Sequence, residues 1–79
     1  MKLEIITPEK KLFSDEVTMV QVPGTKGEFQ ILKNHAAIVS TLNKGTITLR
    51  KTDNTEQTFE IESGLVKCNK NDVNILVEQ

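Results

Sequence analysis

The alternation of apolar and polar side chains along short segments constrains most strongly how this chain folds. In residues 46–50, Ile47 and Leu49 fall on one face, and in residues 55–62 Phe59 and Ile61 do the same. A period of two is typical of a β-strand with one buried face. The same pattern groups Thr18, Val20 and Val22 on one face, and Val73, Ile75 and Val77 on another. These four segments are therefore predicted to be strands.

Composition favours the same fold class. Val, Ile and Thr account for 23 of the 79 residues, and their stiff side chains favour strands over helices. Weaker strand candidates are residues 3–7, 28–32, 36–42 and 65–69, and turn-forming residues separate all these segments. Asp53-Asn54 is expected to form a hairpin turn with a positive φ. The prediction is an all-β fold, a small β-sandwich of about eight to ten short antiparallel strands, or a small barrel.

Length and charge limit the possible function classes. The 79 residues are expected to form one domain, residues 1–79. A single cysteine, Cys68, and a single histidine, His35, allow neither an internal disulfide nor a four-ligand zinc site. A net charge of −1, with no basic block, argues against bulk nucleic-acid affinity. No apolar run is long enough for a membrane span. We expect a soluble, single-domain protein of a reducing compartment whose small core gains stability from a partner.

Gly24-Thr25-Lys26-Gly27 matches the GxxG loop that clamps a nucleic-acid backbone in KH domains. That loop needs a helix on each side, whereas the segments flanking this one read as strands. A tight turn that uses the conformational freedom of glycine is the favoured interpretation.

Two other candidate sites are weak. His35 and Cys68 could form a thiolate–imidazole pair if the fold brought them together, but Cys68 more often acts as a small core residue in such a strand. The three phenylalanines, Phe13, Phe29 and Phe59, are dispersed along the chain. They are better explained as core residues than as the stacking surface of an oligonucleotide-binding barrel. No catalytic or metal-ligating motif is present.

The order of several short motifs resembles the N-terminal β-sandwich domain of the epsilon subunit of F-type ATP synthases. The motifs are Leu12-Phe13-Ser14 after an extended segment, Pro23-Gly24-Thr25-Lys26-Gly27-Glu28, His35-Ala36, Leu42-Asn43-Lys44-Gly45 and Ser63-Gly64-Leu65. Each is weak alone, but together they cover nearly the whole chain. Ala37 stands where the family commonly has proline, Ser63 replaces the first of a usual glycine pair, and Asn34 stands where glycine is common. Asn34 is a sensible replacement because asparagine tolerates the left-handed region.

The resemblance implies a non-catalytic subunit of the central stalk, or rotor, that binds the gamma subunit and the polar loops of the c-ring. Such a subunit takes no cofactor, is not inserted in the membrane, and couples proton translocation to ATP synthesis at the cytoplasmic face of the bacterial cell membrane. The chain ends directly after its last expected strand, so it resembles a short form without the family's C-terminal helical hairpin. Hairpin-based inhibition and ATP binding are therefore not expected.

The resemblance also suggests site residues. By position, Thr25, Lys26 and Glu28 form the loop that faces the c-ring, and His35 and Ser40 are candidates for contact with gamma. No catalytic, cofactor-binding or metal-binding residue is expected. The alternative is a small oligonucleotide-binding β-barrel, which the acidic pI of about 5.8 and the absence of Trp and Tyr disfavour.

Overall fold

A computed structural model describes all residues from 1 to 79 and contains eight β-strands and no helix. The strands are β1 (Lys2–Ile6), β2 (Lys11–Gly24), β3 (Gly27–Leu32), β4 (Ile38–Leu42), β5 (Gly45–Lys51), β6 (Glu56–Ile61), β7 (Ser63–Asn69) and β8 (Asp72–Glu78). The all-β prediction is confirmed, and each expected strand segment overlaps an observed strand.

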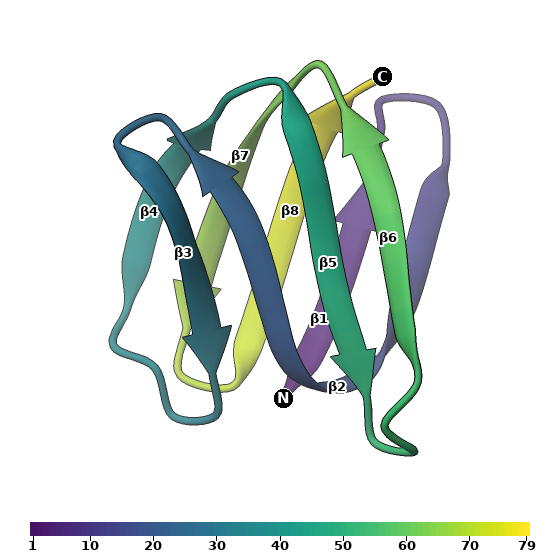
Figure 1. The fold of residues 1–79 in the computed structure, drawn as a ribbon, viewed down its shortest axis with the longest axis vertical. Coiled ribbons are helices and arrows are strands. Elements are labelled where there is room, and N and C mark those ends of the chain that lie inside the picture. The colour runs from purple at the N-terminus through teal and green to yellow at the C-terminus, as the bar shows by residue number, and fades with distance from the viewer.

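The strands form two layers that β2 joins (Figure 1). Its first half pairs with β1, and its second half pairs with β3 and β5. One layer therefore has the order β3-β2-β5-β6, and the other continues from β1 through β8 and β7 to β4. At 14 residues, β2 is much longer than the short strand expected there. It is long enough to serve both layers, so it takes the place of a separate crossover.

One strand pair is parallel rather than antiparallel. β1 and β8, the first and last strands, run side by side with Ile5 opposite Ile75. Neighbouring strands joined by a hairpin must be antiparallel. No hairpin links β1 to β8, so this restriction does not apply to them.

The alternation of side chains builds the core between the two layers. Sixteen buried side chains pack together: Leu3, Ile5, Phe13, Val17, Val20, Val22, Ile31, Leu42, Ile47, Leu49, Ile61, Val66, Cys68, Val73, Ile75 and Val77. No polar or charged residue is buried, so the core carries no unpaired polar group that would cost stability. Phe13 meets Phe59 edge to face, with ring centroids 6.2 Å apart.

The expectation for Thr18 is wrong. The register between β2 and β5 shifts between Val17 and Met19, which is the signature of a bulge. The extra residue lets Val17 and Val20 both enter the core. Thr18 is exposed instead and donates a hydrogen bond from its hydroxyl to the Arg50 carbonyl at 3.3 Å. A bulge interrupts the period of two, so strict alternation cannot locate it.

Candidate functional site

The segment from Gly24 to Gly27 is a tight turn joining β2 to β3, as expected. Gly24 and Gly27 face each other across the two strands, leaving Thr25 and Lys26 at the tip. Gly27 has a φ of 123°, which L side chains rarely adopt. A Cβ on Gly24 would lie 2.7 Å from the Gly27 carbonyl oxygen. Both glycines are therefore needed for the turn, and strands rather than helices flank it.

Hydrogen bonds fix this turn to the end of β4. The Thr25 amide donates to the Thr41 carbonyl at 3.0 Å, and the two threonine hydroxyls lie 3.0 Å apart. Close by, the Asn43 amide donates to the Pro23 carbonyl at 2.8 Å. The turn is thus held against the second layer of the sandwich, and its tip cannot swing freely.

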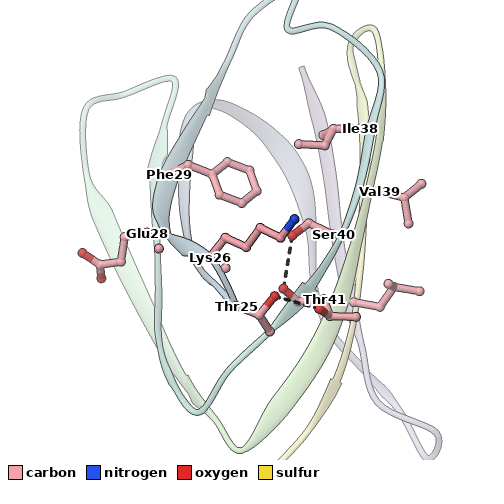
Figure 2. Close-up of a pocket in the computed structure, with 11 residues that line it drawn as sticks. Thr25, Lys26, Glu28, Phe29, Ile38, Val39, Ser40 and Thr41 are labelled. Carbon is pink, nitrogen blue, oxygen red and sulfur yellow. Dashed lines mark hydrogen bonds between the residues drawn. The ribbon is translucent and has the colours of Figure 1, made fainter.

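A hollow of about 580 Å³ lies between this turn, β3 and β4. Figure 2 shows the Lys26 side chain extending across the hollow toward Ser40, with the Phe29 ring above it. Glu28 also lines the hollow, but its carboxylate points away from these groups (Figure 2). Neither Lys26 nor Glu28 belongs to any of the four ion pairs of the structure. Both charges are therefore available to a polar partner.

His35 lies at the opposite end of β3, in the loop that leads to β4. Six strand residues, Gly27–Leu32, separate this loop from the turn, which corresponds to roughly 20 Å at the usual rise per residue. The His35 ring is 2.7 Å from the Ala36 carbonyl through Nδ1. The structure therefore places Ser40 with Lys26, and His35 apart from both.

Cys68 and His35 have separate partners. Cys68 is 2% exposed, and its Sγ lies 3.7 Å from the Lys70 carbonyl oxygen. Burial raises the pKa of the Cys68 thiol, which lowers its fraction of reactive thiolate. The interpretation of Cys68 as a small core residue is confirmed.

The three phenylalanines also belong to the core. Phe13 is part of the buried cluster, while Phe29 and Phe59 are half-buried and pack against it. A stacking surface for single-stranded nucleic acid needs exposed rings on one strand face. The rings of this chain are used for packing instead.

An outer row with three apolar side chains crosses the β1-β8-β7-β4 layer, and the alternation pattern did not predict it. Leu76 lies opposite both Ile6 on β1 and Leu65 on β7, and Leu65 lies opposite Thr41 on β4. We call Ile6, Leu76, Leu65 and Thr41 the outer row. Leu76 is 48% exposed, and a hollow of about 720 Å³ lies along the row. On the same layer, Val39 of β4 is 64% exposed.

A signal for this row was present in the sequence. Ile75, Leu76 and Val77 are consecutive apolar residues on a strand, so the middle one must point away from the face that the other two share. Ile5 and Ile6 show the same conflict. An apolar residue at an outward position marks a surface that another molecule could cover.

One charged group beside this row, Glu4 on β1, is already paired. Hydrogen bonding and attraction from Lys11, together with a hydrogen bond from Ser14, lower the pKa of Glu4. The Lys11 Nζ and Ser14 hydroxyl lie 3.3 and 3.2 Å from the Glu4 carboxylate. Ile6 follows two residues later on the same strand. At its β1 end, the outer row therefore lies beside a carboxylate that already has a partner.

Three features of the surface are available to a partner. The structure has no group of three or more His, Cys, Asp and Glu side chains placed to hold a metal ion. It also has no helix of the length and hydropathy needed to cross a membrane. What it presents is a rigid turn with two free charges, a loop with His35, and the outer row.

Solved structures with the same fold come from ATP synthases. A chain of the Euglena gracilis mitochondrial ATP synthase, solved with OSCP, F1 and c-ring, matches 98% of this chain and 49% of its own length, with a TM-score of 0.91 and 19% identity. A chain of the Tetrahymena thermophila mitochondrial ATP synthase central stalk and c-ring matches 99% of this chain and 63% of its own length, with a TM-score of 0.84 and 20% identity. At these identities the likeness is one of fold.

Sequence relatives are more informative. ATP synthase epsilon chains are 42% identical in Sulfurovum sp. and 43% identical in Chlorobium limicola, over 99% and 98% of this chain. The chain spans 61% of the Sulfurovum relative and 88% of the Chlorobium relative. A family model described as the β-sandwich domain of the ATP synthase delta/epsilon chain matches residues 1–79. The chain therefore belongs to the ATP synthase delta/epsilon chain β-sandwich family, as its motifs suggested.

Proposed function

We propose that this protein is a non-catalytic subunit of the central stalk of an F-type ATP synthase, where it binds the gamma subunit and the c-ring. The observation that carries the proposal is the match to epsilon chains over essentially the whole sandwich. As part of the rotor it couples proton translocation to ATP synthesis, without cofactors and without entering the membrane. The complex lies at the cytoplasmic face of the bacterial cell membrane.

The outer row and Val39 are the surface proposed for gamma. Large apolar side chains that are exposed in the isolated chain favour a partner that removes them from water, and the gain is about 25 cal/mol per Å² of apolar surface. Leu76 and Val39 are among the three most exposed large apolar residues of the molecule. His35 lies beyond the other end of β4 from Thr41. A standard interface buries about 800 Å² on each partner, which is wide enough to include both ends of β4.

The turn carrying Thr25, Lys26 and Glu28 is the surface proposed for the c-ring. Its side chains are exposed and carry both signs of charge, which suits polar loops better than an apolar surface. Thr25 is tied to β4 through Thr41. Force applied at this turn therefore passes directly to the layer that is proposed to hold gamma.

The rigidity of the sandwich suits the transmission of torque. Of the 48 backbone hydrogen bonds, 39 lie within the strands, and the buried residues form a single cluster. Close-packed interiors have low compressibility and transmit strain. Stiffness, rather than chemistry, is the property that such a subunit supplies.

Co-elution with the gamma subunit from the same source tests this function. We expect the wild-type protein to form a stoichiometric complex. Leu76→Asp should weaken it at least tenfold, because a carboxylate would lose water without gaining a partner. Thr58→Asp, an exposed position on β6, is the matched control and should bind as the wild type does.

Separate elution of folded gamma and folded wild-type protein would contradict the proposal. Binding to single-stranded nucleic acid, measured at low salt, would then be the next experiment. Tight binding there would favour the oligonucleotide-binding alternative.

A further inference from the structure

The loop that carries His35, residues 33–37, is joined to the rest of the molecule by one pair of asparagines. The Asn34 amide donates to Oδ1 of Asn71 at 2.9 Å, and Nδ2 of Asn71 donates to Oδ1 of Asn34 at 3.0 Å. The other hydrogen bonds of the loop stay within it or return to Leu32, where β3 ends. No other hydrogen bond connects this loop to a separate part of the chain.

Asn71 is a fixed anchor. It is half-buried in the turn between β7 and β8, and its carbonyl accepts a hydrogen bond from the Lys2 amide at 2.7 Å. The preceding residue, Lys70, has a φ of 59°, and its carbonyl lies against the buried Cys68 thiol. The side chain of Asn71 therefore projects from backbone that β1, β7 and β8 hold in place.

Asn34 is suited to the other half of the pair. Its φ of 64° lies in the left-handed region, which glycine and asparagine enter at little cost. Only a residue with a side-chain acceptor can also receive the second hydrogen bond from Asn71. Glycine at this position would provide the backbone conformation but would lose one of the two hydrogen bonds.

The loop conformation fixes what His35 offers to a partner. A carbonyl oxygen only accepts hydrogen bonds, so Nδ1 of His35 carries the proton that it shares with Ala36. In the neutral ring, Nε2 is then an acceptor. A loop held in this way presents that acceptor in one direction.

We propose that Asn34 and Asn71 form a clasp that positions His35 for contact with the gamma subunit, with Asn71 acting as a positioning residue. The inference rests on the proposed function, because it names gamma as the partner. The clasp lowers the entropy that the loop loses on binding, since the loop is already ordered in the free protein.

The first experiment measures amide hydrogen exchange in the free protein. Asn71→Ala should accelerate exchange of the Asn34 amide about tenfold, because that amide loses its acceptor, while amides of the β5–β6 hairpin should not change. Asn69→Ala, in an exposed residue beside the same turn, is the matched control and should leave Asn34 exchange unchanged. Unchanged exchange in Asn71→Ala would overturn the clasp.

The second experiment measures affinity for gamma. Loss of a neutral hydrogen bond and loosening of the loop should weaken binding about 3- to 10-fold in Asn71→Ala. Asn34→Gly should weaken it less, and Asn34→Asp, which keeps the acceptor, should restore wild-type affinity. Adding Asn71→Ala to His35→Ala should cause no further loss, because the clasp acts through His35.

Two outcomes separate this inference from the proposed function. If the wild type binds gamma and both Asn71→Ala and Asn34→Gly bind it equally well, or if the losses from Asn71→Ala and His35→Ala simply add, the positioning role is wrong and the proposed function stands. If the wild type does not bind gamma, both fail, even where amide exchange shows that the asparagine pair orders the loop.

Discussion

The sandwich has two sides that differ in how completely their strands are paired. At one side, β7 pairs with β8 over its whole length, and β8 pairs in turn with β1. At the other side, β3 pairs only with β2, and β4 pairs with β7 but meets β2 at a single position, Gly24 opposite Leu42. β3 and β4 do not pair with each other, and the hollow beside Lys26 lies between them.

The two sides also differ in how much they contribute to the core. Ile75 and Val66, on the fully paired side, are completely buried, whereas Leu32 and Val39, on the open side, are 51% and 64% exposed. On the open side, β3 and β4 supply only two of the sixteen core residues, Ile31 and Leu42. The open side carries the turn, the His35 loop and part of the surface proposed for gamma, so residues there should affect binding more than stability.

The largest expected effect is the loss of a core side chain. Ile75→Ala should lower the free energy of unfolding by about 2–5 kcal/mol, because it removes buried methyl groups and leaves a cavity. Val39→Ala should change it by no more than about 0.5 kcal/mol, because Val39 is exposed. Urea denaturation measures both. Equal losses would show that the open side contributes to the core as much as the paired side does.

The turn between β2 and β3 is the exception on the open side. Gly24→Ala should destabilise the protein by about 1–3 kcal/mol, because the new methyl group would lie against the Gly27 carbonyl and the Phe29 ring. Lys26→Ala, at the tip of the same turn, is the control and should have little effect on the unfolding midpoint. A neutral Gly24→Ala would mean that the turn relaxes without cost.

A charge change at the turn should affect coupling rather than folding. Lys26→Glu and Glu28→Lys should each reduce ATP-driven proton pumping, relative to ATP hydrolysis, about two- to fivefold in membrane vesicles, as expected for exposed charges at an interface. Thr52→Glu, at an exposed position in the β5–β6 turn at the other end of the sandwich, serves as the control. Unchanged coupling in both variants would remove the turn from the proposed c-ring contact.

The smallest effect is expected at the β5–β6 turn, which belongs to neither of the two sides. Hydrogen bonds from the Thr55 hydroxyl and amide, at 2.6 and 3.0 Å, lower the pKa of Asp53 below its ordinary 3.8. The lowered pKa means that the carboxylate form stabilises the fold above about pH 4, and that this contribution disappears as the pH falls through the folded-state pKa.

Thermal unfolding at several pH values measures this contribution. The wild type should be slightly more stable than Asp53→Asn at pH 6, and the difference should shrink as the pH falls below 3.8. A difference that stays constant down to pH 2 would show that ionisation of Asp53 plays no part in stability.

The strands of the hairpins β5–β6 and β7–β8 could be predicted from the sequence. Ile47 with Leu49, and Val73 with Ile75 and Val77, are all buried as their alternation indicates, because each belongs to a hairpin between neighbouring strands. Asn54 has the expected positive φ, at 71°. Local pattern is sufficient where pairing is local and one face of the strand is buried.

Three features could not be predicted from local pattern. The bulge beside Thr18 depends on how β2 turns from one layer to the other. The outer row depends on the register of four strands, which brings Ile6 next to Leu76 although they are 70 positions apart in the sequence. The asparagine clasp likewise joins residues from two distant loops. Each requires the tertiary arrangement.

Cysteine cross-linking in the assembled ATP synthase tests whether the exposed β4 side of the sandwich contacts gamma. Cysteine replaces Val39 in one variant and Thr58, on the opposite layer, in the other. Cys68 remains in both, since its burial and raised pKa keep it unreactive. We expect Val39→Cys to form a cross-link to gamma and Thr58→Cys to form none. A cross-link from Thr58→Cys alone would contradict this expectation.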